Sequence, residues 1–174
     1  GLHAHSVAGS IFDAIGYPDE HMDFCYENGG EALALTDHGN MNGFSHQFLH
    51  WQKMKEEGKE FKPIFGVEAY FLPSIDEWHD DYDRIKEDAK LAKSLAKQGD
   101  TSGATVEDED ASKKAIKSVI NRRRHLVLLA QNQTGLNNLF KLISESYREE
   151  NFYRYPRVDY KLLAKYSEGV IASS

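Results

Sequence analysis

Two histidines, His3 and His5, stand one residue apart near the start of the sequence, in the stretch LHAHS. Side chains alternate along an extended strand, so both imidazoles would point to the same side of a sheet. Such a pair is typical of metal ligands, although two polar residues close to a chain end are an equally ordinary interpretation. The chemistry of this pair therefore depends on which other residues the fold brings to it.

Further ionisable residues lie at the ends of apolar segments or within them. Asp13 follows the first segment, Asp37 and His38 close ALALTDH, Glu68 lies inside IFGVEAYF, and His125 opens HLVLLAQN. A carboxylate in an apolar strand is costly unless a cation or hydrogen bonds offset its burial, so Glu68 is the hardest to explain without a partner. Asp37 could instead cap a turn, and His125 could be an ordinary histidine at a helix end.

Histidine combined with carboxylate suits zinc, manganese or iron, and one carboxylate can bridge two ions. Bridged ions are a common means of phosphoester cleavage, because they activate a water and neutralise charge on the phosphate. The sequence has no glycine-rich phosphate loop, no nucleophile elbow and no Cys/His pair of evident spacing.

The remaining histidines are expected at surfaces and in packing: His21, His46, His50 and His79.

The chain has 174 residues and a formal net charge of −7. Residues 74–112 hold 12 acidic against 5 basic side chains, a net of −7, so the rest of the chain is neutral. The single cysteine, Cys25, excludes an internal disulfide. No apolar run approaches the ~20 residues of a membrane span and no signal peptide opens the chain, so a cytoplasmic location is expected.

Apolar runs alternate with helical patterns, which predicts an α/β fold. Strands are expected from the start through His5 and over 32–37, 64–71, 125–132 and 169–174. They are almost continuously apolar, as in a parallel sheet or barrel covered on both faces. Helices are expected over 18–28, 42–57 and 159–166 and after NQTG. The highly charged sequence of residues 74–121 predicts an insertion of two helices around a Gly/Ser/Thr turn at 99–105.

Five stretches together resemble a known family: LHAHSVAGSIFDA, ALALTDHGNMNG, PIFGVEAYF, HLVLLAQNQTGLNNLFKLIS and FYRYPRVDYKLLAKYSEGVIAS. In this order they are similar to the polymerase and histidinol phosphatase (PHP) domain, in the form carried by the alpha subunit of bacterial DNA polymerase III, a C-family DNA polymerase. The resemblance covers residues 1–174 except 74–121. It implies a distorted (β/α)7 PHP barrel, incomplete because its C-terminal strands are missing, with the charged helical insertion within it.

The resemblance also implies up to three divalent ions, Zn, Mn or Fe, in the complete domain. Asp37 would orient His38 or its neighbours and, with Glu68, is an expected catalytic residue. The family places a cysteine and an Asp-x-His pair after the point where this sequence ends, so the chain alone is expected to bind metal incompletely and to be inactive. Six side chains would bind the ions: His3 and His5 the first, His125 the second, Asp13 and His38 the third, and Glu68 as the bridge between the first and second.

As a function, the resemblance implies part of a replicative DNA polymerase with metal-dependent 3′–5′ exonuclease capacity. Its expected partners are primer–template DNA and other replisome subunits, and no membrane. All six ligand positions hold competent residues, which favours the active form. Two alternatives stay open: a stand-alone PHP phosphoesterase acting on a small ester such as histidinol phosphate, and a non-catalytic structural or docking module.

Overall fold

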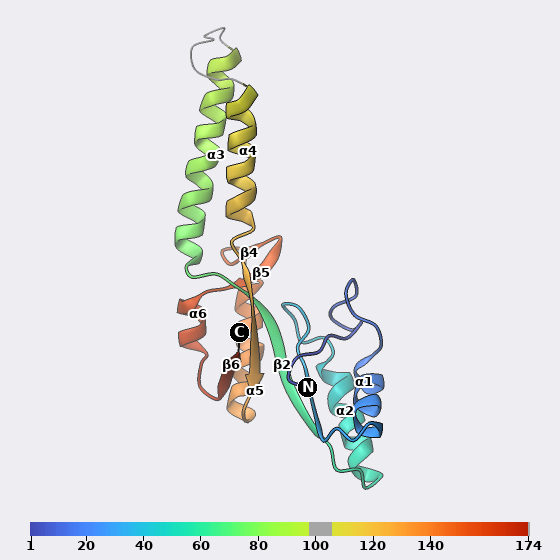
Figure 1. Ribbon diagram of the computed structural model, residues 1–174. Coiled ribbons are helices and arrows are strands. Elements are labelled where there is room, and N and C mark those ends of the chain that lie inside the picture. The colour runs from blue at the N-terminus through green and yellow to red at the C-terminus, as the bar shows by residue number, and fades with distance from the viewer. Residues whose placement is uncertain (98–105, 174) are drawn as a thin grey trace. The chain divides into compact units, whose positions relative to one another are not determined.

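A computed structural model describes residues 1–97 and 106–173 (Figure 1). The chain divides into two compact units. The first, here called the sheet unit, consists of Gly1–Phe71 together with Arg124–Ser174. The second, the helical unit, is Leu72–Arg123. The expected turn at 99–105 lies outside the described residues, whereas all the candidate site residues belong to the sheet unit.

The sheet unit is built on six strands that run in the order β4–β5–β2–β3–β6, with β1 also paired to β2. The β1–β2 and β2–β5 pairs are parallel, and the β2–β3, β3–β6 and β4–β5 pairs are antiparallel. With the helices, they form a mixed α/β fold, which confirms the predicted class. The strands are β1 (Ala32–Leu35), β2 (Lys62–Phe71), β3 (Arg124–Ala130), β4 (Phe152–Tyr153), β5 (Tyr155–Val158) and β6 (Val170–Ser173).

The expectation of a parallel sheet is wrong for β3, which runs antiparallel to both of its neighbours, β2 and β6. Phe71, the last residue of β2, is the register partner of Arg124, the first residue of β3. The chain therefore returns at the strand end from which it left, and β3 must run in the opposite direction to β2. Burial on both faces makes a strand apolar whatever its direction, so hydropathy could not distinguish the two arrangements.

The first expected strand, from the start through His5, does not form a regular strand. The segment nevertheless lies alongside β1, because the Ala34 N–H donates to Gly1 O at 3.0 Å and the Thr36 N–H donates to Ala4 O at 2.8 Å. These backbone hydrogen bonds fix His3 and His5 beside the central sheet. The hairpin formed by β4 and β5 was not expected from the sequence.

Four helices flank the sheet: α1 (Pro18–Glu27), α2 (Phe44–Glu56), α5 (Gln133–Ser146) and α6 (Tyr160–Lys165). Pro18 occupies the first turn of α1, where its missing N–H costs nothing. Asn132 and Asp159 cap α5 and α6 by accepting hydrogen bonds from Gly135 N and Leu162 N, both at 2.9 Å. Helix α5 packs on β3 and β2, and α1 packs on α2 (Figure 1).

Two apolar clusters form the core of the sheet unit. One joins the middle of the sheet to α5, and the other joins β1 to α1 and α2. The first contains Val67, Ala69, Leu128, Leu139, Leu142 and Val158, and the second contains Met22, Leu33, Met54 and Phe61. Val67 and Ala69 face the first cluster on either side of Glu68, so strand alternation turns Glu68 to the opposite face of β2.

The helical unit contains α3 (Ile75–Lys97) and α4 (Val106–Ile120), which pack on each other. The buried Trp78 donates its indole N–H to Val119 O at 2.8 Å. Arg122 pairs with Asp81. Among the residues that the structure describes, no helix is both long and apolar enough to cross a membrane.

Candidate metal centre

Glu68 lies at the middle of the candidate site. Glu68 belongs to β2 and is only 4 % exposed. Its backbone forms an isolated parallel bridge to His38, in which the Glu68 N–H donates to Asp37 O at 3.0 Å and the Gly39 N–H donates to Glu68 O at 2.9 Å. The bridge aligns the TDHG loop with the strand, so the side chains of His38 and Glu68 meet.

Four imidazoles converge on the Glu68 carboxylate. His3 Nε2 and His5 Nε2 lie 3.3 and 3.1 Å from Oε2, and His38 Nδ1 lies 3.1 Å from the same oxygen. His125 Nδ1 lies 2.6 Å from the other oxygen, Oε1. Two sets of side chains can therefore each hold an ion, and Glu68 belongs to both: His3, His5 and Glu68, and His38, Glu68 and His125.

The spacing of these atoms fits a divalent metal. His3 Nε2 and His5 Nε2 are 3.0 Å apart. Two nitrogens bound to one zinc ion at about 2.0–2.1 Å in tetrahedral geometry are separated by roughly 3.4 Å. Glu68 Oε2 and His38 Nδ1 are buried and make no hydrogen bond among the described residues, although imidazole nitrogens surround the oxygen. Converging donor atoms of this kind are what a cation would satisfy.

Asp13 extends the cluster on the side of His38. Its Oδ2 lies 2.6 Å from His38 Nε2, while Nδ1 of the same ring faces Glu68. Asp13 is exposed, and it lies on the loop that follows His3 and His5. The structure thus brings together all six of the side chains expected to bind metal.

His125 reaches the cluster because β3 is antiparallel to β2. It stands near the start of β3, and its register partner is Tyr70, near the end of β2. Had β3 been parallel, a residue at its start would lie at the opposite edge of the sheet. The reversed strand direction therefore places this histidine two residues from Glu68 along the sheet.

Asp37 does not contact the other candidate ligands through its carboxylate. Asp37 is only 3 % exposed, and its Oδ1 accepts hydrogen bonds from Ser6 N at 2.7 Å and from Ser10 Oγ at 2.9 Å. Oδ2 accepts from Ser6 Oγ at 2.9 Å. Ser10 Oγ in turn accepts from the His38 N–H at 3.1 Å. Asp37 thus ties the loop that carries His5 and Asp13 to the strand end that carries His38.

Sequence reasoning did not single out Ser6 and Ser10 as part of this arrangement. Both are buried, and both donate to Asp37. The signal available was weak: Ser6 directly follows the H-x-H pair, and serine is common in loops for many reasons. Only the fold reveals that these hydroxyl groups satisfy a buried carboxylate.

A row of aromatic rings in contact with one another extends from the cluster to the β4–β5 hairpin. The His5 and His38 rings are stacked with centroids 4.2 Å apart, and the Tyr70 ring lies 5.9 Å beyond His38 at an angle of 12°. Tyr70 also contacts His125 edge-on at 5.4 Å and the Tyr155 ring at 4.8 Å. The aromatic residues of β2 and β5 therefore form one wall of the site, which sequence reasoning did not foresee.

Gly39 allows the hairpin to approach the metal-site loop this closely. Its φ is +65°, and a Cβ there would lie 2.7 Å from Pro156 Cγ and 3.2 Å from the Tyr70 ring. A side chain at this position would be strained and would also clash with the hairpin.

The environment lowers the pKa of His5 below its ordinary value of 6.5. Burial of the ring is the main cause, and the neighbouring imidazole of His38 adds to it, while the Glu68 carboxylate opposes the change. His5 therefore keeps a neutral imidazole, the form that binds metal, to a lower pH than an ordinary histidine does.

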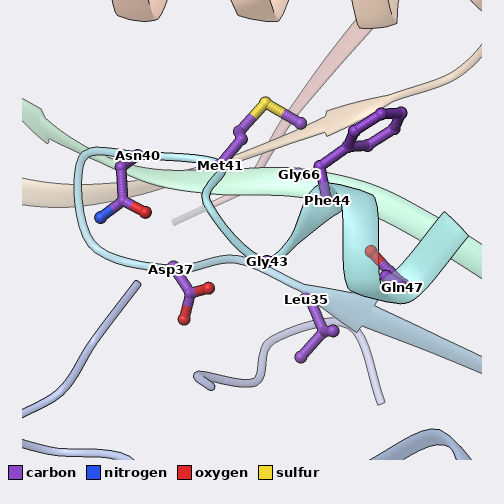
Figure 2. Close-up of a pocket in the computed structure, with 8 residues that line it drawn as sticks. All are labelled: Leu35, Asp37, Asn40, Met41, Gly43, Phe44, Gln47 and Gly66. Carbon is purple, nitrogen blue, oxygen red and sulfur yellow. The ribbon is translucent and has the colours of Figure 1, made fainter. Parts of the chain in front are cut away.

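A small cavity lies beside Asp37 (Figure 2). Figure 2 shows Asp37 and Asn40 on the loop between β1 and α2, and Gly66 on the neighbouring strand β2. The volume of this cavity, about 10 Å³, allows no more than a single water, so the cavity is no substrate pocket.

A larger groove of about 450 Å³ lies at the other end of β2, and among the residues that line it only Lys62 is charged.

The other histidines lie apart from this cluster. His50 Nε2 pairs with Asp23 at 2.8 Å, between α2 and α1, and His79 packs edge-on against Trp78 in the helical unit. Neither belongs to a group of described residues that could hold a metal.

Comparison with known proteins identifies the chain's relatives. The family model of the PHP domain matches residues 1–174. The DNA polymerase III alpha subunit of Aquifex aeolicus is 34% identical over 98% of this chain and 12% of that protein. That of Treponema pallidum is 34% identical over 99% of this chain and 11% of that protein. The chain thus spans about a tenth of the length of these relatives.

Similar solved structures include a protein from Bifidobacterium adolescentis that is described as a metal-dependent phosphoesterase. The TM-score is 0.43 and the identity 10%, over 83% of this chain and 32% of that one.

Proposed function

Because the chain belongs to the PHP domain family, we propose that it carries the metal site of a phosphoesterase that cleaves phosphodiester bonds. The observation that carries the proposal is the position of Glu68, whose carboxylate is shared by the His3–His5 pair and by His38 with His125. Divalent ions bound at such a site supply a Lewis acid and an activated water. Zn²⁺, Mn²⁺ and Fe²⁺ all suit this set of nitrogen and oxygen donors.

We assign His3 and His5 to a first ion and His125 to a second, with Glu68 as their bridge. His38 needs a separate argument, because a neutral imidazole has only one lone pair to give. Its Nε2 lies 2.6 Å from Asp13, and its Nδ1 lies 3.1 Å from Glu68. We therefore pair His38 with Asp13 at a third ion, through Nε2.

Asp37 acts in this proposal as a positioning residue and not as a group that touches the substrate. Its three hydrogen bonds to Ser6 and Ser10 hold the loop against the strand end, and through Ser10 they reach the His38 backbone. Partners of this kind orient the ligands of metal sites. We further propose that the six strands are part of a distorted (β/α)7 barrel whose remaining strands this chain does not include, and that the helical unit is an insertion in it.

The relatives favour a role in DNA replication. Both are alpha subunits of a bacterial DNA polymerase. We propose that the chain is a segment of such a subunit, that its site removes nucleotides as a 3′–5′ exonuclease, and that it works in the cytoplasm on primer–template DNA with other replisome subunits. The imidazoles gathered on Glu68 support catalysis over a purely structural or docking role, since each expected ligand position retains a competent side chain.

The test uses the protein expressed from the complete gene, freed of metal with a chelator and then supplied with Mn²⁺ or Zn²⁺. Release of mononucleotides from the 3′ end of single-stranded DNA is measured, with histidinol phosphate as the competing small substrate. We expect metal-dependent nucleotide release that Glu68→Ala abolishes. His50→Gln is the matched control, because it removes an imidazole that is paired to a carboxylate outside the site. Exonuclease activity that survives Glu68→Ala contradicts the assignment.

A further inference from the structure

Beside the metal cluster lies a surface of aromatic and basic residues formed by Tyr70, Tyr153, Arg154 and Tyr155, here called the tyrosine–arginine shelf. It abuts the cluster directly, since the Tyr70 ring contacts His38 and His125 and the Tyr155 ring contacts Tyr70. The three tyrosines are partly exposed. Aromatic surface therefore reaches solvent next to the site where Glu68 gathers the imidazoles.

Arg154 stands at the tip of the hairpin, between β4 and β5. It is the one non-glycine residue with positive φ, at 60°, among those that the structure describes. Such a conformation is unfavourable for arginine, and residues held in it cluster at functional sites. The pairing of Tyr153 with Tyr155 across the turn and the packing of Tyr155 on Tyr70 hold it there.

The charge of Arg154 is available to a ligand. The residue is exposed, and its guanidinium lies over the Tyr153 ring, 5.8 Å from the ring centre. Within the described part of the chain, no carboxylate pairs with it. An arginine stacked on a tyrosine keeps its N–H groups free to point outward, where they match the geometry of a phosphate.

We propose that the shelf binds the nucleotide next to the scissile phosphate, with a base stacked on Tyr155 and the neighbouring phosphate held by Arg154. This inference rests on the proposed function, because it takes the metal cluster as the place where the phosphodiester is cleaved. A small phosphate monoester has no second phosphate and no second base, so it gains nothing from the shelf. The shelf thus selects a polynucleotide strand over a small ester.

The chemistry of the shelf favours a single strand over a protein partner. Stacking on tyrosine needs an unpaired base, and it tolerates any base because all have a π-face. A guanidinium beside the rings adds attraction to the backbone. A protein partner could also cover the partly exposed tyrosines, but only a polynucleotide carries condensed counterions whose release makes log K fall linearly with log salt.

The first test measures binding of a fluorescein-labelled single-stranded oligothymidylate to the metal-free chain by fluorescence anisotropy. We expect Arg154→Gln to weaken binding and to lower the slope of log K against log salt by about 0.7, the value for one phosphate of a single strand. Tyr155→Leu is expected to weaken binding roughly tenfold. Arg154→Lys and Tyr155→Phe should retain most of the affinity, and Lys55→Gln on α2 is the charge-matched control.

The second test separates this inference from the proposed function. In the protein from the complete gene, Arg154→Gln should raise KM for oligonucleotide hydrolysis, whereas the control Lys55→Gln should leave KM for the oligonucleotide and kcat for bis(p-nitrophenyl) phosphate unchanged. Metal-dependent hydrolysis that responds to Glu68→Ala but not to either shelf variant overturns the shelf and leaves the metal site standing. Oligonucleotide binding that depends on Arg154, in a protein without hydrolysis, supports the shelf and overturns the proposed function. Equal binding by the wild-type chain and Arg154→Gln, which removes only an exposed side chain, also overturns the shelf.

Discussion

His38 and Glu68 meet twice: a parallel backbone bridge joins them, and His38 Nδ1 lies 3.1 Å from Glu68 Oε2. The backbone contact explains the side-chain contact, because strand residues paired in register project to the same face. The TDHG loop is therefore tied to β2 by backbone hydrogen bonds. Main-chain hydrogen bonds consequently hold the two central members of the proposed metal cluster in place.

Replacing Glu68 with glutamine should remove the ligand that the first and second ions share. We expect affinity for Zn²⁺ and Mn²⁺ to fall by more than about a hundredfold, since even the loss of an outer partner of a ligand costs about 10–100-fold. Competition with a chromophoric chelator measures this. Asp23→Asn is the matched control, because Asp23 pairs with a single imidazole among the described residues, that of His50. Unchanged affinity in Glu68→Gln would show that the cluster is not a metal site.

Asp37→Asn should destabilise the chain even without metal. The asparagine keeps one acceptor but brings an NH₂ group toward the hydroxyl and N–H donors of Ser6 and Ser10, so we expect a loss of about 3 kcal/mol in the free energy of unfolding. Urea unfolding in EDTA measures it. Ser10→Ala, which deletes one of the donors, should cost about 1 kcal/mol. A loss of stability seen only in the presence of metal would contradict the positioning role.

Gly39→Ala should be more destabilising than the same change at another glycine with positive φ. Gly58 has φ +76°, and a methyl group added there would have no neighbouring atom within 4 Å, so alanine at this position introduces only backbone strain, about 1 kcal/mol. At Gly39 the methyl also meets Pro156 and Tyr70. We expect the loss in unfolding free energy to be roughly twice as large or more. Urea unfolding of the two variants compares them, and equal losses would mean that the hairpin does not pack against the loop.

The His5 imidazole should titrate below pH 6.5 in the folded, metal-free chain, because burial and the His38 ring disfavour its charged form. The unfolded chain then binds more protons between the folded pKa and 6.5, so stability rises with pH across that window and His5 contributes no slope above it. NMR of the histidine ring carbons against pH measures the midpoint. His5→Gln should reduce the rise in stability, and a midpoint at or above 6.5 would refute the effect of burial.

Much of the site could be anticipated from residue types and positions. Glu68 stood out because an acidic residue in an apolar strand needs partners, and the H-x-H pair offered two. The six expected ligands do converge, although their binding of metal stays a prediction. Family membership, expected from five motifs, is confirmed by the family match.

What could not be anticipated depends on strand direction and on contacts distant in the sequence. Alternation and hydropathy are the same for either direction, so nothing in HLVLLAQN indicated that β3 runs antiparallel. The β4–β5 hairpin turns at an arginine, whereas turns with positive φ are normally marked by glycine or asparagine. The shelf was missed for the same reason, since its tyrosines meet only after the hairpin folds against β2.

The register of Phe71 with Arg124 also has an evolutionary consequence. The polypeptide leaves and re-enters the sheet at adjacent positions, so everything from Leu72 to Arg123 is topologically a single loop. The entropic cost of closing a loop grows only slowly with its length. This junction is therefore a natural insertion site, where lineages could gain, lose or exchange a module while Glu68 and His125 keep their alignment. For the same reason an engineer could graft a reporter there.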